Sequence, residues 1–499
     1  MKKVNLFYIF SLLFIAVGCN DAIEIDQPGR LDEDAAFQSV DDLQAGLFGV
    51  YNNLDITPEI AFTAVFTDEL AIGFDSGGQG FQDYGFTLNA GSATPAVIWT
   101  RSYAAINAAN RLIEAAEALT PEDGEQALYN NILGETYAIR AYQHFRLQSF
   151  FSTDLTDDSA LGVIAVDFVP TIDQNLLRNT NAEVFALITA DLDKAQSLIS
   201  TQEDPTFISL DFVKALRARM AAYRQKYAVA GPLAEQLLNK YGLATQEEYE
   251  DIWFDDSNAE IIFKLERTIG DSYDQQGATG TPAGEGWLGA RFAFVTRGVD
   301  GSPYFEIGRS LFNQLDTADV RYDVIVHPSS VVDPDYASGP GAEDNDILVI
   351  DKYPGSEGRP LMNDQKIFRS SEMLLILAEA RADGGSFNGA TNSTASLIKR
   401  MRDARFGDDT LLPVYANQTE AFADILEERR IELAYEGHRY LDLKRLGVRA
   451  NQGVLKDPVD CAFNGACSLS PTDYRFTLPL PIVEFNANPG LREQQNPGY

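Results

Sequence analysis

Aromatic rings stand beside amide and carboxylate side chains in two glycine-rich stretches of the chain. Residues 74–86 read FDSGGQGFQDYGF, and residues 271–294 contain Trp287 as their only tryptophan. Flat apolar rings can cover the CH groups of a sugar, while amides and carboxylates bond to its hydroxyls. We therefore expect a carbohydrate-binding site at these two loops. Its candidate residues are Trp287, Tyr84, Phe81, Phe74, Asp83, Gln82, Tyr273 and Arg291.

Core packing is the alternative role for the same rings. Aromatic side chains in a loop-rich region also form the core of that region, and residue type alone does not separate the two roles. Trp287 is the strongest candidate for ligand contact, because it is the only tryptophan of its loop and polar side chains flank it.

Motifs for catalysis are missing from the sequence. HExxH, GxSxG and the phosphate-binding P-loop do not occur. Asp and Glu together number 74, so carboxylate pairs arise from composition alone, and counting them does not identify a glycosidase. We expect a binding protein that is not an enzyme and needs no cofactor.

Five acidic residues in a proline- and glycine-rich loop are the candidate ligands for a structural calcium ion. They lack the spacing of an EF-hand, and we favour a solvated acidic loop over a metal site. These residues are Asp333, Asp335, Glu343, Asp344 and Asp346.

Two cysteines lie close together near the C-terminus, Cys461 and Cys467 in the run DCAFNGACS. In an oxidising compartment, such a pair with no third free thiol favours a local disulfide. No histidine or further cysteine lies near them in the sequence, so we do not expect zinc.

The N-terminal segment predicts export and a lipid anchor. Residues 1–18 carry two lysines, an apolar run and then small residues, as a secretory signal peptide does. Ala16-Val17-Gly18-Cys19 resembles a bacterial lipobox, with Ala16 where leucine is usual. We expect cleavage before Cys19 and acylation of this residue, which would anchor the protein to a membrane. A plain signal peptide cut near Gly18 is the alternative.

The charge balance excludes one class of partner. The formal net charge is −35, so the surface repels nucleic acid and anionic lipid headgroups. A strongly anionic ligand is also disfavoured, unless a local basic patch such as Arg291 with Arg297 compensates.

The periodicity of apolar residues predicts a mostly helical protein. Helices are expected at 40–54, 99–118, 125–151, 181–199, 211–227, 233–241, 367–382, 393–407 and 422–447. Their pairing at intervals of about 30 to 45 residues indicates tetratricopeptide-like repeats. Residues 268–351 are loop-rich, and short apolar runs there, such as 323–326, are expected to be small strands.

The expected helix 422–447 carries Glu428, Glu432 and Glu436 at spacings of four residues. Like charges at this spacing repel by a few tenths of a kcal/mol per pair in an isolated helix. We therefore expect them to pack against cationic partners in the helical bundle, and Arg369 and Glu372 are the first contacts to check. A solvated, salt-bridged face is the alternative.

Within this helix, the run ERRIELAYEGHRYLDLKR resembles the C-terminal signature of the SusD/RagB family. Further family motifs follow in the family's order, although the Gly and Pro that usually follow the helix ending at Phe151 are missing. The motifs are carried by Trp99, Tyr103, Ile106 and Asn110; by Gly134, Glu135, Arg140 and Ala141; by Asp191, Leu192 and Ala195; by Arg369, Glu372, Leu375 and 378–380; and by the closing Leu478 to Pro481, Glu484, Asn488 and QNPGY.

This resemblance implies a mainly α fold in which tetratricopeptide-like pairs form a scaffold under an irregular capping subdomain with a few short strands. The regions expected from it are a lipoprotein signal peptide at 1–18, a lipidated tether at 19–38, an N-terminal helical region at 39–267, a loop-rich ligand-binding insertion at 268–366 and a C-terminal SusD/RagB region at 367–499.

The resemblance also implies a function. Members of the family are surface-exposed, lipid-anchored nutrient-binding proteins of the outer membrane in Bacteroidetes-type bacteria. Their partner is a SusC-like TonB-dependent transporter, which they cover as a lid. We expect this chain to capture an oligosaccharide and deliver it to such a transporter. A RagB-like peptide-binding protein and a helical-repeat scaffold without a nutrient ligand are the alternatives.

Overall fold

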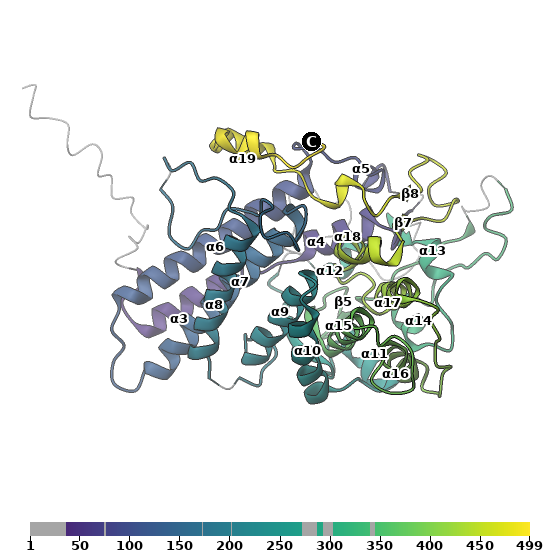
Figure 1. The fold of residues 1–499 in the computed structure, drawn as a ribbon, viewed down its shortest axis with the longest axis horizontal. Coiled ribbons are helices and arrows are strands. Elements are labelled where there is room, and N and C mark those ends of the chain that lie inside the picture. The colour runs from purple at the N-terminus through teal and green to yellow at the C-terminus, as the bar shows by residue number, and fades with distance from the viewer. Residues whose placement is uncertain are drawn as a thin grey trace, which may run out of the picture.

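Long helices lie side by side at one end of the elongated molecule (Figure 1). The structure is a computed structural model that describes residues 36–73, 76–171, 173–200, 202–271, 287–292, 303–339 and 345–499. The long helices are α3 (Val40–Tyr51), α6 (Ala93–Ala118), α7 (Gln126–Phe151) and α8 (Asn181–Leu198), and the shorter α4 (Thr57–Phe66) follows α3.

Helix α7 is the centre of this group and packs against both α6 and α8. Arg140 of α7 donates to Asp191 of α8 at 2.6 Å and to Asn110 of α6 at 2.8 Å. A Cβ atom on Gly134 would lie 2.6 Å from a side-chain atom of Ile199, so this glycine allows the chain after α8 to approach α7 closely. Residues of the family motifs thus hold neighbouring helices together.

The other end of the molecule contains a second set of packed helices. Helix α10 packs against α9 and α15, and α15 packs against α16 and α17. Paired helices with few strands confirm the predicted fold class. This set comprises α9 (Leu210–Tyr223), α10 (Tyr227–Tyr241), α11 (Gln246–Trp253), α15 (Ser370–Asp383), α16 (Thr394–Phe406), α17 (Gln418–Glu432) and α18 (Arg439–Ala450).

Strands are short, and in the described ranges they form two-stranded antiparallel sheets. Sheet β1–β3 aligns Leu70 with Ile307 and thereby joins the N-terminal region to the middle of the chain. The strands are β1 (Leu70–Ile72), β2 (Ile261–Leu265), β3 (Phe305–Ile307), β4 (Gly355–Ser356), β5 (Arg359–Pro360), β6 (Gln365–Arg369), β7 (Val454–Leu455) and β8 (Ser468–Leu469), paired as β1–β3, β2–β6, β4–β5 and β7–β8.

Short helical elements occupy the loops. The expected strand at 323–326 is wrong, because Asp319 caps a helix here by accepting from the backbone NH of Arg321. These elements are α5 (Phe81–Tyr84), α12 (Leu288–Phe292), α13 (Arg309–Phe312), α14 (Val320–Ile325), η2 (Tyr474–Phe476), α19 (Ile482–Ala487) and η3 (Pro489–Gln494).

The single helix expected over 422–447 is wrong, because the chain breaks between α17 and α18. Tyr435 has φ 60° and Gly437 has φ 86°, and neither angle is compatible with a continuing right-handed helix. The backbone NH of Tyr435 donates to the carboxylate of Glu69 at 3.2 Å, and its hydroxyl donates to the Glu69 carbonyl at 2.9 Å. Tertiary contacts with Glu69 therefore hold the break in place.

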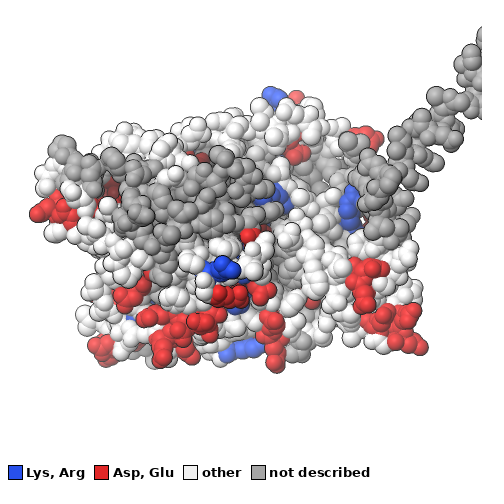
Figure 2. Space-filling model, turned by 180° about the vertical axis from the view of Figure 1, so that it is seen from behind, with Lys and Arg blue, Asp and Glu red and all other residues white. Residues whose placement is uncertain are grey.

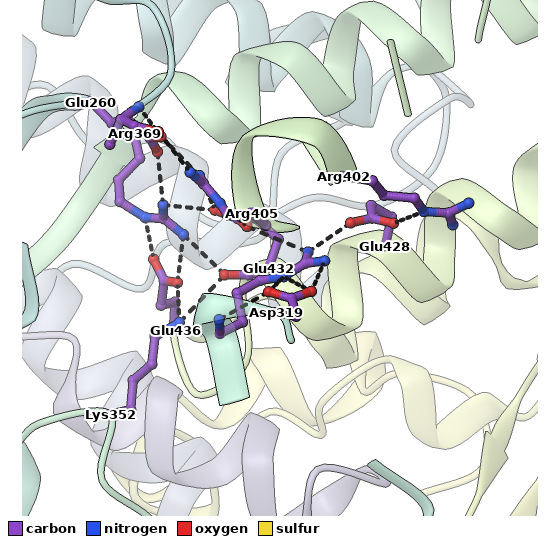
Figure 3. Close-up of polar contacts among 11 residues, drawn as sticks. Glu260, Asp319, Lys352, Arg369, Arg402, Arg405, Glu428, Glu432 and Glu436 are labelled. Carbon is purple, nitrogen blue, oxygen red and sulfur yellow. Dashed lines mark hydrogen bonds and ion pairs between the residues drawn. The ribbon is translucent and has the colours of Figure 1, made fainter. Parts of the chain in front are cut away.

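Glutamates spaced along this segment are buried with their cationic partners (Figure 3). Glu428, Glu432 and Glu436 expose 2%, 0% and 5% of their surface, which confirms that the stripe packs inside the bundle. The partners come from α14, the loop before β4, β6 and α16. They are Arg321, Lys352, Arg369, Arg402 and Arg405.

Glu432 is the centre of this ion-pair network. Arg369 and Arg405 each place a guanidinium nitrogen 2.9 Å from its Oε1 atom. Arg369 also donates to Glu436 at 2.8 Å and to Glu260 at 3.1 Å. Burial opposes ionisation of Glu432, but these arginines outweigh it and hold the pKa of this carboxyl well below its usual range.

Arg369 is confirmed as a partner of the glutamate stripe. Glu372 does not ion-pair with the stripe. Glu372 accepts from Nε and Nη2 of Arg219 at 2.7 and 2.6 Å. Arg219 belongs to α9, which packs against α15, so Glu372 forms its bidentate pair with that helix.

Candidate functional site

The short helix α5 carries four of the predicted site residues, Phe81, Gln82, Asp83 and Tyr84. Glycines with positive φ precede it, including Gly80 at φ 73°. A Cβ atom on Gly80 would lie 2.7 Å from the ring of Phe305, so this turn needs glycine both for its backbone angle and for space. The helix is thereby held beside β3.

Two exposed aromatic rings lie together at this helix. Phe81 is 42% exposed and Phe463 is 51% exposed, and their ring centroids are 5.0 Å apart at an angle of 41°. We call this pair the Phe81–Phe463 platform. Phe463 was not among the predicted site residues, although an aromatic residue between two bonded cysteines was a signal that could have identified it.

A disulfide holds Phe463 in position. Cys461 and Cys467 are bonded with their Cα atoms 5.2 Å apart, which confirms the predicted bridge. Inside the loop, the backbone NH of Gly465 donates to the Cys461 carbonyl at 2.8 Å. The bridge and this turn restrict the backbone that carries Phe463, so the ring is presented with little conformational freedom.

Tyr84 packs against Phe463 of the platform and is not exposed to a ligand. Its exposed fraction is 0%, its hydroxyl donates to the Asp460 carbonyl at 3.0 Å, and its ring stacks on Phe463 at 5.7 Å. The ammonium group of Lys456 lies 3.4 Å from the centroid of the Tyr84 ring. The expectation of ligand contact at Tyr84 is therefore replaced by a core-packing role.

Polar side chains lie around the exposed rings. Gln82 and Asn464 are exposed, and Asp83 is half-buried. Burial raises the pKa of Asp83 to about 6, while a hydrogen bond from the Thr94 hydroxyl opposes this shift. Amide and carboxylate groups at the edge of an apolar face are the arrangement that carbohydrate recognition requires.

Trp287 and Arg291 lie on a different element from the platform, at helix α12. Trp287 is partly buried against Ala290 and Leu361. Its indole NH donates to the Thr268 carbonyl at 3.3 Å, so part of the ring is used to join α12 to the turn after β2. Arg291 is half-buried on the same helix. Phe74, Tyr273 and the lipidation site Cys19 lie outside the described residues, as does Arg297.

One carboxylate of the acidic loop at 333–346 forms an ion pair. Asp346 binds the Arg309 guanidinium at 2.9 Å and accepts from the backbone NH of Asp333 at 2.8 Å. In the part of the chain that the structure describes, no group of three His, Cys, Asp or Glu residues could hold a metal ion. Glu343 and Asp344 lie outside that part.

Acidic side chains gather along the lower edge of the face seen in Figure 2. On α11, burial raises the pKa of Glu250, and the neighbouring carboxylates Asp323, Asp251 and Glu247 raise it further. Such carboxylates repel one another and would repel an anionic ligand. Across the described ranges, no helix is both long and apolar enough to span a bilayer.

Two protein-family models match separate parts of the chain. Residues 349–499 match the SusD family, and residues 33–224 match a SusD-like family described as starch-binding and associating with the outer membrane. Two SusD-like proteins of Formosa agariphila, P2 and P38, are 25% and 24% identical to this chain over the full length of both sequences in each case.

Solved structures share the fold at low sequence identity. A putative sugar-binding protein from Bacteroides vulgatus has a TM-score of 0.73 and 23% identity, covering 93% of this chain and 99% of its own. A SusD superfamily protein from Bacteroides thetaiotaomicron has a TM-score of 0.74 and 23% identity over 92% of this chain and 100% of its own. Surface glycan-binding protein A from Bacteroides fluxus has a TM-score of 0.69 and 19% identity, covering 93% and 100%.

Proposed function

The chain belongs to the SusD family, and from this premise we propose that it captures an oligosaccharide at the bacterial surface and passes it to an outer-membrane transporter. SusD-like proteins bind carbohydrate and are not catalytic. One of the two matched families is described as starch-binding and associating with the outer membrane. Proteins with sugar-binding and glycan-binding names among the structural neighbours support the same class of ligand.

The Phe81–Phe463 platform is the observation that carries the proposal. Two large apolar rings, Phe81 and Phe463, lie together and remain about half exposed. A sugar ring placed on them would cover apolar surface with its CH groups. Gln82, Asp83 and Asn464 would then lie at the edge of that face, where hydroxyls project.

Affinity electrophoresis of platform variants tests this assignment. Phe463→Ala and Phe81→Ala should each lose retention in gels that contain a polysaccharide bound by the wild type, with affinity reduced about tenfold. The gels would contain soluble starch, laminarin or xylan. Phe168→Ala is the matched control, because Phe168 is 42% exposed and lies outside the platform. Unchanged migration of both platform variants would contradict the assignment.

Trp287 and Arg291 provide a further candidate surface within the same function, and Phe74 and Tyr273 stay proposed ligand contacts. Trp287→Ala should abolish retention in the same gels, since it removes a partly buried indole just before α12 that could stack on a sugar ring. A variant that migrates like the wild type would restrict Trp287 to its packing role against Ala290 and Leu361.

The proposal also includes a lipid anchor and a transporter partner. Cys19 would carry the acyl chains, and a SusC-like TonB-dependent barrel would receive the ligand. Mass spectrometry of the mature N-terminal peptide should find acylated Cys19, and Cys19→Ala should release the protein from the membrane fraction. Affinity purification from solubilised outer membranes should recover the barrel. An unmodified N-terminus, or recovery without any barrel, would contradict the corresponding part.

A further inference from the structure

A cleft of about 430 Å³ opens between the C-terminal end of α3, the loop 204–208 and the turn after β2. We call it the α3 cleft. It shares no residue with the Phe81–Phe463 platform, and none of the predicted ligand-binding residues that the structure describes lines it. Its principal lining residues are Phe48, Tyr51, Asp55, Phe207, Arg267 and Asp271.

Aromatic rings form one side of the α3 cleft. Phe48 is 50% exposed, and its ring centroid lies 6.4 Å from that of the half-buried Phe207. Tyr51 meets Phe207 edge-on at 6.0 Å. Phe48 is thus a large apolar side chain that stays open to solvent on a helix whose valines and leucines are buried.

Internal hydrogen bonds fix the loop that presents Phe207. The Tyr51 hydroxyl donates to Glu135 at 2.5 Å and accepts from the backbone NH of Ile208 at 2.7 Å. On the other side, the backbone NH of Lys264 donates to the Pro205 carbonyl at 2.9 Å. A ligand would therefore meet a wall that is already in position, which reduces the entropy lost on binding.

Charged groups also line the cleft, and most of them are oriented by other bonds. Arg267 pairs with the buried Asp55 at 3.0 Å. Asp271 accepts from the backbone NH of Thr268 at 2.6 Å and is half-buried at the rim. Counting Glu266, three carboxylates and one guanidinium line the cleft, so it is net negative. This charge disfavours an anionic ligand but offers acceptors for hydroxyl groups.

We propose that the α3 cleft is a second carbohydrate-binding site that takes one uncharged sugar unit of an oligosaccharide. The apolar face of the sugar packs on Phe48 and Phe207, and its hydroxyls donate to Asp271 and Glu266. The volume lies within the range of small-ligand sites. The inference rests on the proposed function for the class of ligand, and it adds a location that the family motifs do not include.

A glycan array followed by titration calorimetry tests the second site on the purified full-length protein. The array would contain neutral, amino and uronic-acid oligosaccharides, and calorimetry would use the neutral oligosaccharide that binds best. Phe48→Ala and Phe207→Ala should each weaken binding about tenfold, because each removes one stacking face. Phe254→Ala is the control, since Phe254 is 41% exposed and does not line the cleft.

The outcomes separate the second site from the proposed function. If the wild type binds neutral glycans and both cleft variants keep its affinity, the second site is overturned while the function stands. If the wild type binds no glycan on the array, the function fails and the second site fails with it. Binding restricted to uronic-acid glycans overturns the neutral ligand. Thermal unfolding of each variant separates lost binding from lost folding.

Discussion

Glu432 accepts hydrogen bonds from two arginines in the interior, and its negative charge should be needed for the stability of the fold. Replacing it with Gln removes one carboxylate from the buried network, although Arg369 and Arg405 keep their pairs with Glu260. Glu432→Gln should lower the free energy of unfolding by about 3 to 5 kcal/mol, as measured by urea denaturation. Glu427→Gln is the control, because the Glu427 side chain is 31% exposed and should cost less than about 1 kcal/mol. Equal costs at both positions would contradict a structural role for the network.

Glu69 is another buried carboxyl, and it should make the free energy of unfolding depend on pH. Burial raises its pKa from 4.5 to about 8, and its Oε2 atom has no hydrogen-bond partner. A folded-state pKa above the unfolded value means that its stabilising contribution is complete below about pH 4.5 and is lost as pH rises through about 8. Glu69→Gln cannot ionise. Its unfolding free energy relative to the wild type should therefore grow by on the order of 4 kcal/mol between about pH 4 and about pH 9.

Asp68 is the matched comparison for that experiment. Burial opposes its ionisation, but Arg430 and Arg439 outweigh burial and lower its pKa to about 2. Its contribution is therefore present above the unfolded value of 3.8 and is lost as pH falls through about 2. Asp68→Asn should be destabilised at neutral pH and approach the wild type near pH 2. A common pH trend for both variants would contradict the assignments.

Residue types predicted which loops carry aromatic rings but not which rings face outward. Phe81 is open and Tyr84 is buried within the same short helix, because Asp460 and Lys456 approach Tyr84 from the C-terminal region, whereas Phe463 contacts both rings. Those contacts join residues that are far apart in sequence. The disulfide was predictable, because two cysteines six positions apart constrain each other without any knowledge of the fold.

At the scale of helices, replacing glycine with alanine should change stability in opposite directions at Gly134 and Gly49. Gly134→Ala on α7 would place a Cβ atom 2.6 Å from Ile199, and overpacking should cost about 1 to 3 kcal/mol. Gly49→Ala on α3 meets nothing within 4 Å and should stabilise the protein by about 0.5 to 1 kcal/mol. Thermal or urea unfolding of both variants checks the pair. Similar shifts in the same direction would contradict close contact at Gly134.

Helix existence was predictable from periodicity, whereas helix ends and breaks depended on tertiary contacts. The long helices α6, α7 and α8 appear where apolar spacing predicted them. The expected helix at 367–382 begins as strand β6 instead, because Gln365–Arg369 pairs with β2. Likewise, the break at Tyr435 is held by hydrogen bonds to Glu69, and Gly437 is its one local signal in 422–447. Helices α4 and α11 were not predicted.

At the scale of the whole molecule, the net charge of −35 predicts that salt stabilises the fold. Raising NaCl from about 0.01 M to about 1 M shortens the screening length from about 30 Å to about 3 Å. The midpoint of thermal unfolding should rise, since repulsion between surface carboxylates weakens. Asp323→Asn should reduce this rise, because Asp323 lies near Glu250. Asp409→Asn should not reduce it, because Asp409 is attracted to Lys399. A falling midpoint would contradict the argument.

The ion-pair network of Figure 3 also determines how the chain can be divided. Its charges come from Glu260, Asp319, Lys352, Arg369 and Glu432, positions spread over much of the second half of the sequence. A truncated protein that ends anywhere between the first and the last of these positions would have buried ions without counter-ions. We therefore expect the second half to unfold as one cooperative unit, and a new ligand preference to arise by exchange of exposed loops rather than of a block of helices.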